Sequence, residues 1–200
     1  MIVYKIVRGV LRIYFKIFNS WVIEGEENIP VSGPVVLVAN HISLWDPVFV
    51  GCSTKRVVHY MAKEELFKIF GLKQLVTSLA AFPVKRGKID RNSMRMAAKY
   101  LEDGEVLGLF PEGTRSKTKE VGPFLQGASL FALRSGAPIV PVALMGTNKI
   151  FLGKITVRIG KPLSYPEYYG GKLGEEILTK VTTDSRERII ELLDQNKTIA

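Results

Sequence analysis

Residues 34–47 have the sequence PVVLVANHISLWDP, an apolar run that passes directly into Asn40 and His41. A short apolar run without polar alternation predicts a strand buried on both faces, as in the parallel sheets of α/β proteins. Asp46 followed by Pro47 is typical of the first turn of a helix. Because open α/β sheets bind ligands at the carboxyl ends of their strands, we expect His41 and Asp46 to meet in one turn beside a crevice.

The spacing of His41 and Asp46 alone leaves two interpretations open. An aspartate before proline is also an ordinary helix N-cap, and a single histidine is usually a satisfied polar residue. A second polar cluster, residues 110–116 (FPEGTRS), follows another apolar run at residues 106–110. Two polar clusters at two strand ends predict one shared crevice, which favours a catalytic site.

In the order and spacing of its motifs the sequence resembles the glycerophospholipid acyltransferases, and within them the 1-acylglycerol-3-phosphate acyltransferases. His41 and Asp46 match the first motif of that family, residues 110–116 match the third, and residues 139–142 (IVPV) match the fourth. The second motif, residues 81–86 (AFPVKR), keeps the arginine but has alanine where glycine is frequent. The resemblance covers most of the chain, and it is specific because several individually weak motifs occur together.

The resemblance implies a glycerolphosphate acyltransferase-like α/β fold, with a mainly parallel central sheet flanked by helices. Alternating apolar runs and helical patterns predict the same sheet. Acyl transfer to an alcohol requires a base that takes the hydroxyl proton, and neutral imidazole suits this role. His41 is the predicted base, and Asp46 is predicted to accept a hydrogen bond from the other ring nitrogen and fix the tautomer. The donors of an oxyanion hole stay unassigned.

A Gly-x-Ser-x-Gly nucleophile elbow is absent from the sequence. A thioester donor is already activated because its thiolate leaves readily. We therefore expect direct transfer without an acyl-enzyme. The resemblance implies that a fatty acyl group passes from acyl carrier protein or coenzyme A to the sn-2 hydroxyl of 1-acylglycerol 3-phosphate (lysophosphatidic acid), forming phosphatidic acid. Glycerol 3-phosphate or another lysolipid is an alternative acceptor, since the His41 chemistry does not distinguish them. A non-catalytic basic membrane-binding protein is the alternative from another class.

The implied acceptor carries a phosphate group. Guanidinium groups with a nearby ammonium hold phosphate oxygens by charge and by geometry, which makes Lys63, Arg86 and Arg115 candidates. Each of the three could instead be an ordinary surface cation. Glu112 resembles the residue that relatives associate with the glycerol part of the acceptor, and Gly113 would let the backbone approach the ligand. The full set of substrate-binding candidates is Lys63, Arg86, Glu112, Gly113, Thr114 and Arg115.

Composition limits the class of protein. The 200 residues are 46% hydrophobic and contain no Pro/Gly/Ser-rich linker, which predicts one well-buried domain, residues 21–200, after an N-terminal helix. The single cysteine, Cys52, excludes an internal disulfide and a cysteine-based metal site, and we expect no metal or other cofactor. The net charge of +9 favours nucleic acid, anionic membranes or acidic substrates as partners. No zinc-finger spacing or aromatic RNA-binding signature favours nucleic acid.

Residues 1–20 are predicted to form an amphipathic membrane-interface helix. Apart from tyrosines, residues 2–18 are apolar with four cations at steps of three or four, namely Lys5, Arg8, Arg12 and Lys16. Such steps place the cations on one stripe of a helix. A membrane-spanning helix needs about 20 mostly uncharged residues, so we expect this helix to lie in the interface at the cytoplasmic face of the cell membrane. The alternative is a helix packed on the domain with its basic stripe in solvent.

Three further expectations concern the sheet and its surroundings. His59 lies inside an apolar strand predicted at residues 56–61, which favours a structural role. Residues 64–70 predict a helix that buries Phe70. Residues 154–160 alternate apolar and polar side chains, which predicts a strand near the sheet edge with one face in solvent.

Overall fold

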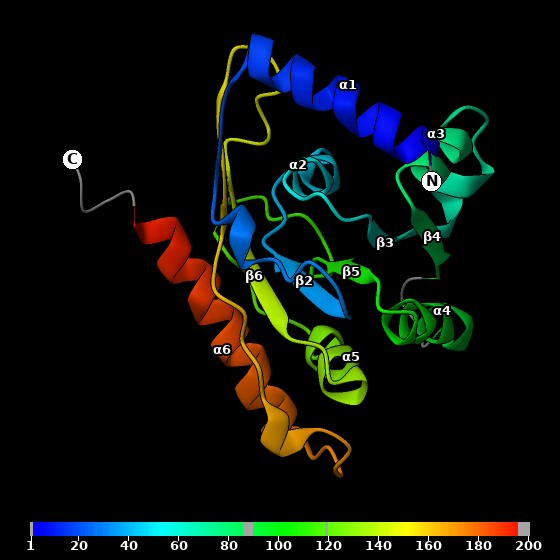
Figure 1. Ribbon diagram of the computed structural model, residues 1–200, viewed down its shortest axis with the longest axis vertical. Coiled ribbons are helices and arrows are strands. Elements are labelled where there is room, and N and C mark those ends of the chain that lie inside the picture. The colour runs from blue at the N-terminus through cyan, green and yellow to red at the C-terminus, as the bar shows by residue number, and fades with distance from the viewer. Residues whose placement is uncertain (1, 86–89, 119, 196–200) are drawn as a thin grey trace.

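The computed structural model describes residues 2–85, 90–118 and 120–195. These residues contain one seven-stranded sheet with helices on both faces (Figure 1). The strands are β1 Ser20–Glu24, β2 Val35–Ala39, β3 Val58–Lys63, β4 Ala81–Val84, β5 Val106–Leu109, β6 Ile139–Met145 and β7 Lys154–Ile159. Their order across the sheet is β1-β7-β6-β2-β5-β3-β4. The neighbours β6, β2, β5, β3 and β4 run parallel, whereas β7 is antiparallel to β6. The expected mainly parallel sheet flanked by helices is confirmed.

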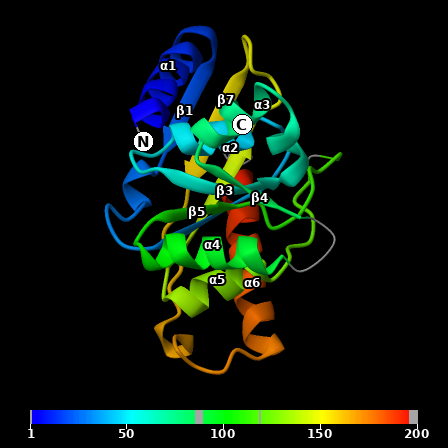
Figure 2. The same cartoon turned by 90° about the vertical axis from the view of Figure 1, so that its right-hand side faces the viewer.

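The helices form two layers. They are α1 Ile2–Phe18, α2 Asp46–Cys52, α3 Leu72–Ser78, α4 Arg91–Glu102, α5 Gly127–Ser135 and α6 Glu175–Asp194, with 3-10 turns at η1 Glu26–Asn28, η2 Glu64–Lys68 and η3 Pro166–Tyr168. Helices α1 and α2 lie over one face of the sheet, and α4, α5 and α6 lie over the other (Figures 1 and 2). Phe15 and Phe49 are buried in the core on the first face. The core on the second face contains Leu101, Leu133 and Ile189.

Strand β2 lies inside the sheet, between β5 and β6. All five of its residues are at most 2% exposed. Leu37 packs into the core under α1 and α2, while Val36 and Val38 pack into the core under α4, α5 and α6. Burial on both faces explains why this strand has an uninterrupted apolar sequence. The chain leaves its carboxyl end near the middle of the sheet, which is where a crevice is expected.

Helix α1 packs on the domain through one face and exposes an apolar face. Tyr4 and Phe15 are buried, and the Arg8 guanidinium donates hydrogen bonds to the carbonyls of residues 54–56 at 2.8–3.3 Å. Lys5 and Lys16 are exposed. The outward face carries Ile2, Val3, Ile6, Val10, Ile13 and Ile17, each at least 59% exposed. Within the described part of the chain, no helix combines the length and the apolar character needed to span a membrane.

The segment after β3 differs from the expected single helix. A 3-10 turn spans Glu64–Lys68, and Gly71, with φ 80°, leads into α3, which the sequence did not predict. The expected burial of Phe70 was wrong, because this side chain is 94% exposed. The glycine turns the chain between two short helices, so Phe70 lies at the tip of a turn and outside the apolar face of either helix.

The expected solvent-facing side of β7 was also wrong. Arg158 is 7% exposed and forms an ion pair with Glu24 of β1. Its guanidinium also donates a hydrogen bond to the carbonyl of Leu192 in α6. Burial of a cation is tolerated where it pairs with a carboxylate and donates to a carbonyl, so the polar side of the strand can be covered by a helix.

Candidate active site

The turn after β2 is anchored by the side chain of Asn40. Its amide Nδ2 donates to the carbonyl of Leu144 in β6 at 3.1 Å, and its Oδ1 accepts from the Leu144 N–H at 2.8 Å. Asn40 is 2% exposed. The side chain therefore continues the ladder between β2 and β6 while the backbone turns away, which fixes the position of His41.

His41 and Asp46 come together inside this turn. His41 Nδ1 lies 2.7 Å from Asp46 Oδ2, and the ring stacks on Phe110 with 4.4 Å between centroids. A carboxylate can only accept a hydrogen bond, so Nδ1 carries the proton and Nε2 carries the lone pair. The pair thus has the geometry of an oriented base, with Nε2 as the atom that can take a proton.

Asp46 is held by more contacts than the histidine alone. Its Oδ2 also accepts hydrogen bonds from the backbone N–H groups of Ile42 and Ser43, both at 2.7 Å. Its Oδ1 accepts from Thr147 Oγ1 at 2.5 Å. Asp46 and Thr147 are both fully buried. Four donors to one buried carboxylate satisfy its oxygens and leave it little freedom to rotate.

Glu112 joins the His41 turn to the loop after β5. Its Oε1 accepts from the His41 N–H at 2.8 Å, and its Oε2 accepts from the Gly122 N–H at 3.3 Å. The Ser116 N–H donates to the His41 carbonyl at 2.8 Å. The two polar clusters of the sequence therefore lie side by side, as the shared crevice requires.

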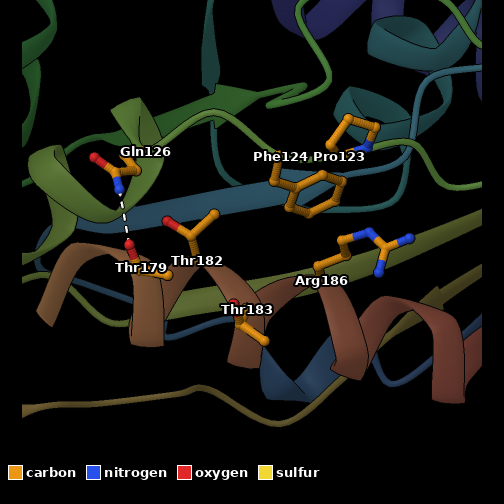
Figure 3. Close-up of a pocket in the computed structure, with 7 residues that line it drawn as sticks. All are labelled: Pro123, Phe124, Gln126, Thr179, Thr182, Thr183 and Arg186. Carbon is orange, nitrogen blue, oxygen red and sulfur yellow. Dashed lines mark hydrogen bonds between the residues drawn. The ribbon is translucent and has the colours of Figure 1, made fainter. Parts of the chain in front are cut away.

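Arg186 of α6 holds the same loop from the other side. Its guanidinium donates from Nε to the Gly122 carbonyl at 2.9 Å and from Nη2 to the Val121 carbonyl at 2.8 Å. The side chain borders a hollow of about 350 Å³ that Pro123, Phe124 and threonines of α6 also line (Figure 3). Gly122 thus lies between Arg186 and Glu112, and α6 is linked through it to the His41 turn.

Two of the three predicted phosphate-binding cations, Lys63 and Arg115, are exposed. Lys63 ends β3, and its ammonium lies 3.4 Å from a carboxylate oxygen of Glu65. Arg115 is exposed in the loop after β5, the neighbour of β3 in the sheet. Gly113 (φ 70°) and Thr114 are exposed in the same loop. Arg86 lies outside the described residues.

Comparisons with known proteins identify the family. The family model named Acyltransferase matches residues 20–145. A 1-acyl-sn-glycerol-3-phosphate acyltransferase from Bacillus subtilis is 32% identical, over 96% of this chain and 99% of the relative. One from Borreliella burgdorferi is 28% identical, over 88% of this chain and 72% of the relative. The chain belongs to the acyltransferase family.

A solved structure of another acyltransferase has the same fold. The crystal structure of the 1-acyl-sn-glycerophosphate acyltransferase PlsC from Thermotoga maritima has a TM-score of 0.73 and 30% identity, covering 96% of this chain and 81% of that chain. In the present acyltransferase the family match contains both His41 and Asp46. The resemblance stated from the motifs is therefore confirmed.

Sequence reasoning missed three residues that position the site of this acyltransferase. Thr147 contacts Asp46 across 101 residues of sequence, and Arg186 contacts Gly122 across 64. Asn40 was visible in the sequence, but nothing there indicated its hydrogen bonds to β6.

Among the residues that the structure describes, no three His, Cys, Asp or Glu side chains are grouped to hold a metal ion.

Proposed function

We propose that this acyltransferase moves a fatty acyl group from an acyl thioester to the sn-2 hydroxyl of 1-acylglycerol 3-phosphate, forming phosphatidic acid for phospholipid synthesis. The observation that carries the proposal is the contact between His41 and the buried carboxylate of Asp46. The names of the relatives from Bacillus subtilis and Borreliella burgdorferi support the choice of acceptor.

In the proposed reaction His41 acts as a base. Its Nε2 takes the proton from the acceptor hydroxyl while the hydroxyl oxygen attacks the thioester carbonyl. The new carbon–oxygen bond forms, the carbon–sulfur bond breaks, and the thiolate leaves and receives the proton. Asp46 stabilises the imidazolium that forms and keeps the ring oriented, without changing its own protonation.

The acceptor phosphate is proposed to bind at the cations beside the His41 turn. Lys63 is the last residue of β3, Arg115 lies in the loop after the neighbouring strand β5, and Arg86 belongs to the same proposed set. Glu112, Gly113 and Thr114 would border the glycerol part. Since both Glu112 oxygens already accept backbone hydrogen bonds, we assign that residue the further role of joining the two loops.

The enzyme is proposed to work at the cytoplasmic face of the cell membrane. Residues 1–20 would be the membrane-interface helix and residues 21–200 the catalytic domain. The exposed isoleucines and valines on α1 support this placement, because they form an apolar face directed away from the domain. The acyl donor would be the thioester of acyl carrier protein or of coenzyme A.

Product identification tests the proposal. The purified full chain is given 1-acylglycerol 3-phosphate, glycerol 3-phosphate or a choline lysophospholipid in detergent, each with acyl–acyl carrier protein or acyl–coenzyme A. We expect phosphatidic acid from the first acceptor as the preferred product, and none above background with His41→Ala. Preference for another acceptor would assign one of the alternative acyltransfer reactions. A folded chain that transfers nothing would point to a non-catalytic membrane-binding protein and would contradict the proposal.

A further inference from the structure

The turn between β6 and β7 has a fixed shape. Gly146, with φ 74°, and Gly153 lie near its ends, and a Cβ at either position would come within 2.5 Å of a backbone oxygen. Between them Phe151 is 60% exposed and Leu152 is 77% exposed. Leu152 has φ 53°, a left-handed conformation that leucine rarely adopts. Phe151 and Leu152 thus form an apolar tip that is exposed to solvent. The backbone of Leu152 is strained.

This turn is joined to the end of α1. The Leu152 N–H donates to the Phe18 carbonyl at 2.9 Å, and the ring of Phe151 stacks on that of Phe18 with 5.9 Å between centroids. The Asn19 amide Nδ2 donates to the Lys149 carbonyl at 3.2 Å. The apolar tip and the exposed face of α1 are thus parts of one connected unit.

A second apolar tip lies at the other end of α1. Phe70 is 94% exposed and Ile69 is 53% exposed, just before α3, which packs beside α1. Helices α1 and α3 and the β6–β7 turn lie at the same end of the molecule in both views (Figures 1 and 2). We call residues 2–18, 69–79 and 146–154 the apolar end.

The charges of the apolar end have one sign. The chain contains 19 acidic residues, and none of them lies in these three segments. Lys149 and Lys154 flank the Phe151–Leu152 tip, Lys73 lies in α3, and all three are exposed. Apolar tips bordered by lysines match an anionic lipid surface, where side chains enter the acyl region and cations stay among the headgroups. Two copies of this end would repel each other.

We propose that the apolar end is a single bilayer-contact surface, and that the β6–β7 turn inserts Phe151 and Leu152 as a second contact beside α1. This inference rests on the proposed function at a membrane. The same turn supplies Thr147, which holds Asp46. One short segment therefore contacts the lipid and also supports the catalytic pair. The membrane that carries the acceptor would then lie beside the His41 turn.

Vesicle binding by the full chain tests the proposal. Co-sedimentation with phosphatidylglycerol–phosphatidylcholine vesicles compares the parent with Phe151→Ser/Leu152→Asn, since asparagine tolerates the left-handed backbone. Loss of two inserted apolar side chains should raise the dissociation constant at least about 10-fold. Val31→Ser is the matched control, because Val31 is 93% exposed, precedes the amino end of β2 and lies outside the three segments of the apolar end. It should bind as the parent does.

Insertion of the tip can also be measured directly. Phe151→Trp should show fluorescence quenching by brominated acyl chains beyond that of the parent, whereas Val31→Trp should not. Unchanged binding by the double variant, equal loss with Val31→Ser, or absence of added quenching in Phe151→Trp would overturn the proposal. So would a dimer in solution that depends on Phe151. Transfer to detergent-dispersed acceptor reports the proposed function separately, so its loss is distinguishable from loss of vesicle binding.

Discussion

His41 and His59, the two histidines of the chain, lie in one sheet but in different surroundings. His41 follows the end of β2 and contacts the buried carboxylate of Asp46. His59 lies within β3, where its ring stacks on Tyr100 with 3.8 Å between centroids. Burial lowers the pKa of His59, which favours the neutral ring.

The difference shows that position along a strand determines what a histidine can do. At the end of β2 the chain turns, and the backbone and Asp46 can orient an imidazole beside a crevice. Inside β3 the ring stacks on Tyr100, and burial there lowers its pKa more than the nearby charge of Glu105 raises it. We therefore expect substitutions of His41 to change turnover, and substitutions of His59 to change the free energy of unfolding.

The largest effect is expected for His41→Ala. Removing a general base lowers turnover by at least about 100-fold. The midpoint of thermal unfolding should stay close to that of the parent, because the His41 side chain is not part of either buried core. Steady-state transfer assays and a thermal melt measure the two quantities. A folded variant with near-normal turnover would end the assignment of His41 as the base.

Arg115→Ala should weaken use of the phosphate-bearing acceptor more than use of the donor. A lost hydrogen bond to a charged group is worth roughly 1.5–3 kcal/mol, so kcat/KM for the acceptor should fall about 10-fold to 100-fold. Lys117→Ala, another exposed cation in the same loop, is the matched control and should have little effect. A change confined to the donor parameters would place Arg115 in a different subsite.

Thr147→Val should lower turnover by roughly 10-fold, because Asp46 loses a donor while the volume at position 147 is kept. The acceptor KM should change little, since Thr147 contacts Asp46 and is buried away from solvent. Thr147→Ser keeps the hydroxyl and should recover most of the turnover. Equal losses in the two variants would show that the methyl group matters and that the hydrogen bond does not.

The smallest effect is expected for His59→Phe, which should leave turnover at neutral pH unchanged. The pKa of His59 is lower in the folded chain than in the unfolded chain, so the unfolded state binds more protons as pH falls below about 6.5. The free energy of unfolding of the parent should therefore decrease in that range, and His59→Phe should remove that part of the decrease. Denaturant titrations at several pH values measure it, and identical pH dependence in both proteins would contradict the assignment.

Local rules were enough to predict the centre of this fold. The apolar run of β2 predicted a fully buried strand, and Asp46-Pro47 predicted the helix start that brings the carboxylate to His41. These features depend on neighbouring residues only. Thr147 and Arg186 could not be found in this way, because a hydroxyl and a guanidinium far along the chain have no motif that links them to the site.

The two wrong expectations have a common physical cause. Apolar periodicity predicted that Phe70 is buried, and polar alternation predicted that Arg158 faces solvent, yet the exposures are the reverse. A sequence pattern gives the polarity of each side chain, but it does not give the tertiary contacts that bury that side chain. Pairing with β1 and coverage by α6 bury Arg158, and the turn at Gly71 exposes Phe70.

A double-mutant cycle on His41 and Asp46 tests the central claim, that the aspartate acts through the histidine. Turnover is measured for the parent, His41→Ala, Asp46→Asn and the double variant, with thermal melts to confirm that each is folded. Residues that act as one unit have strongly non-additive effects. We therefore expect the double variant to be no slower than His41→Ala alone, within about threefold. Losses that multiply, so that the double variant is slower by the product of the two single effects, would contradict the account.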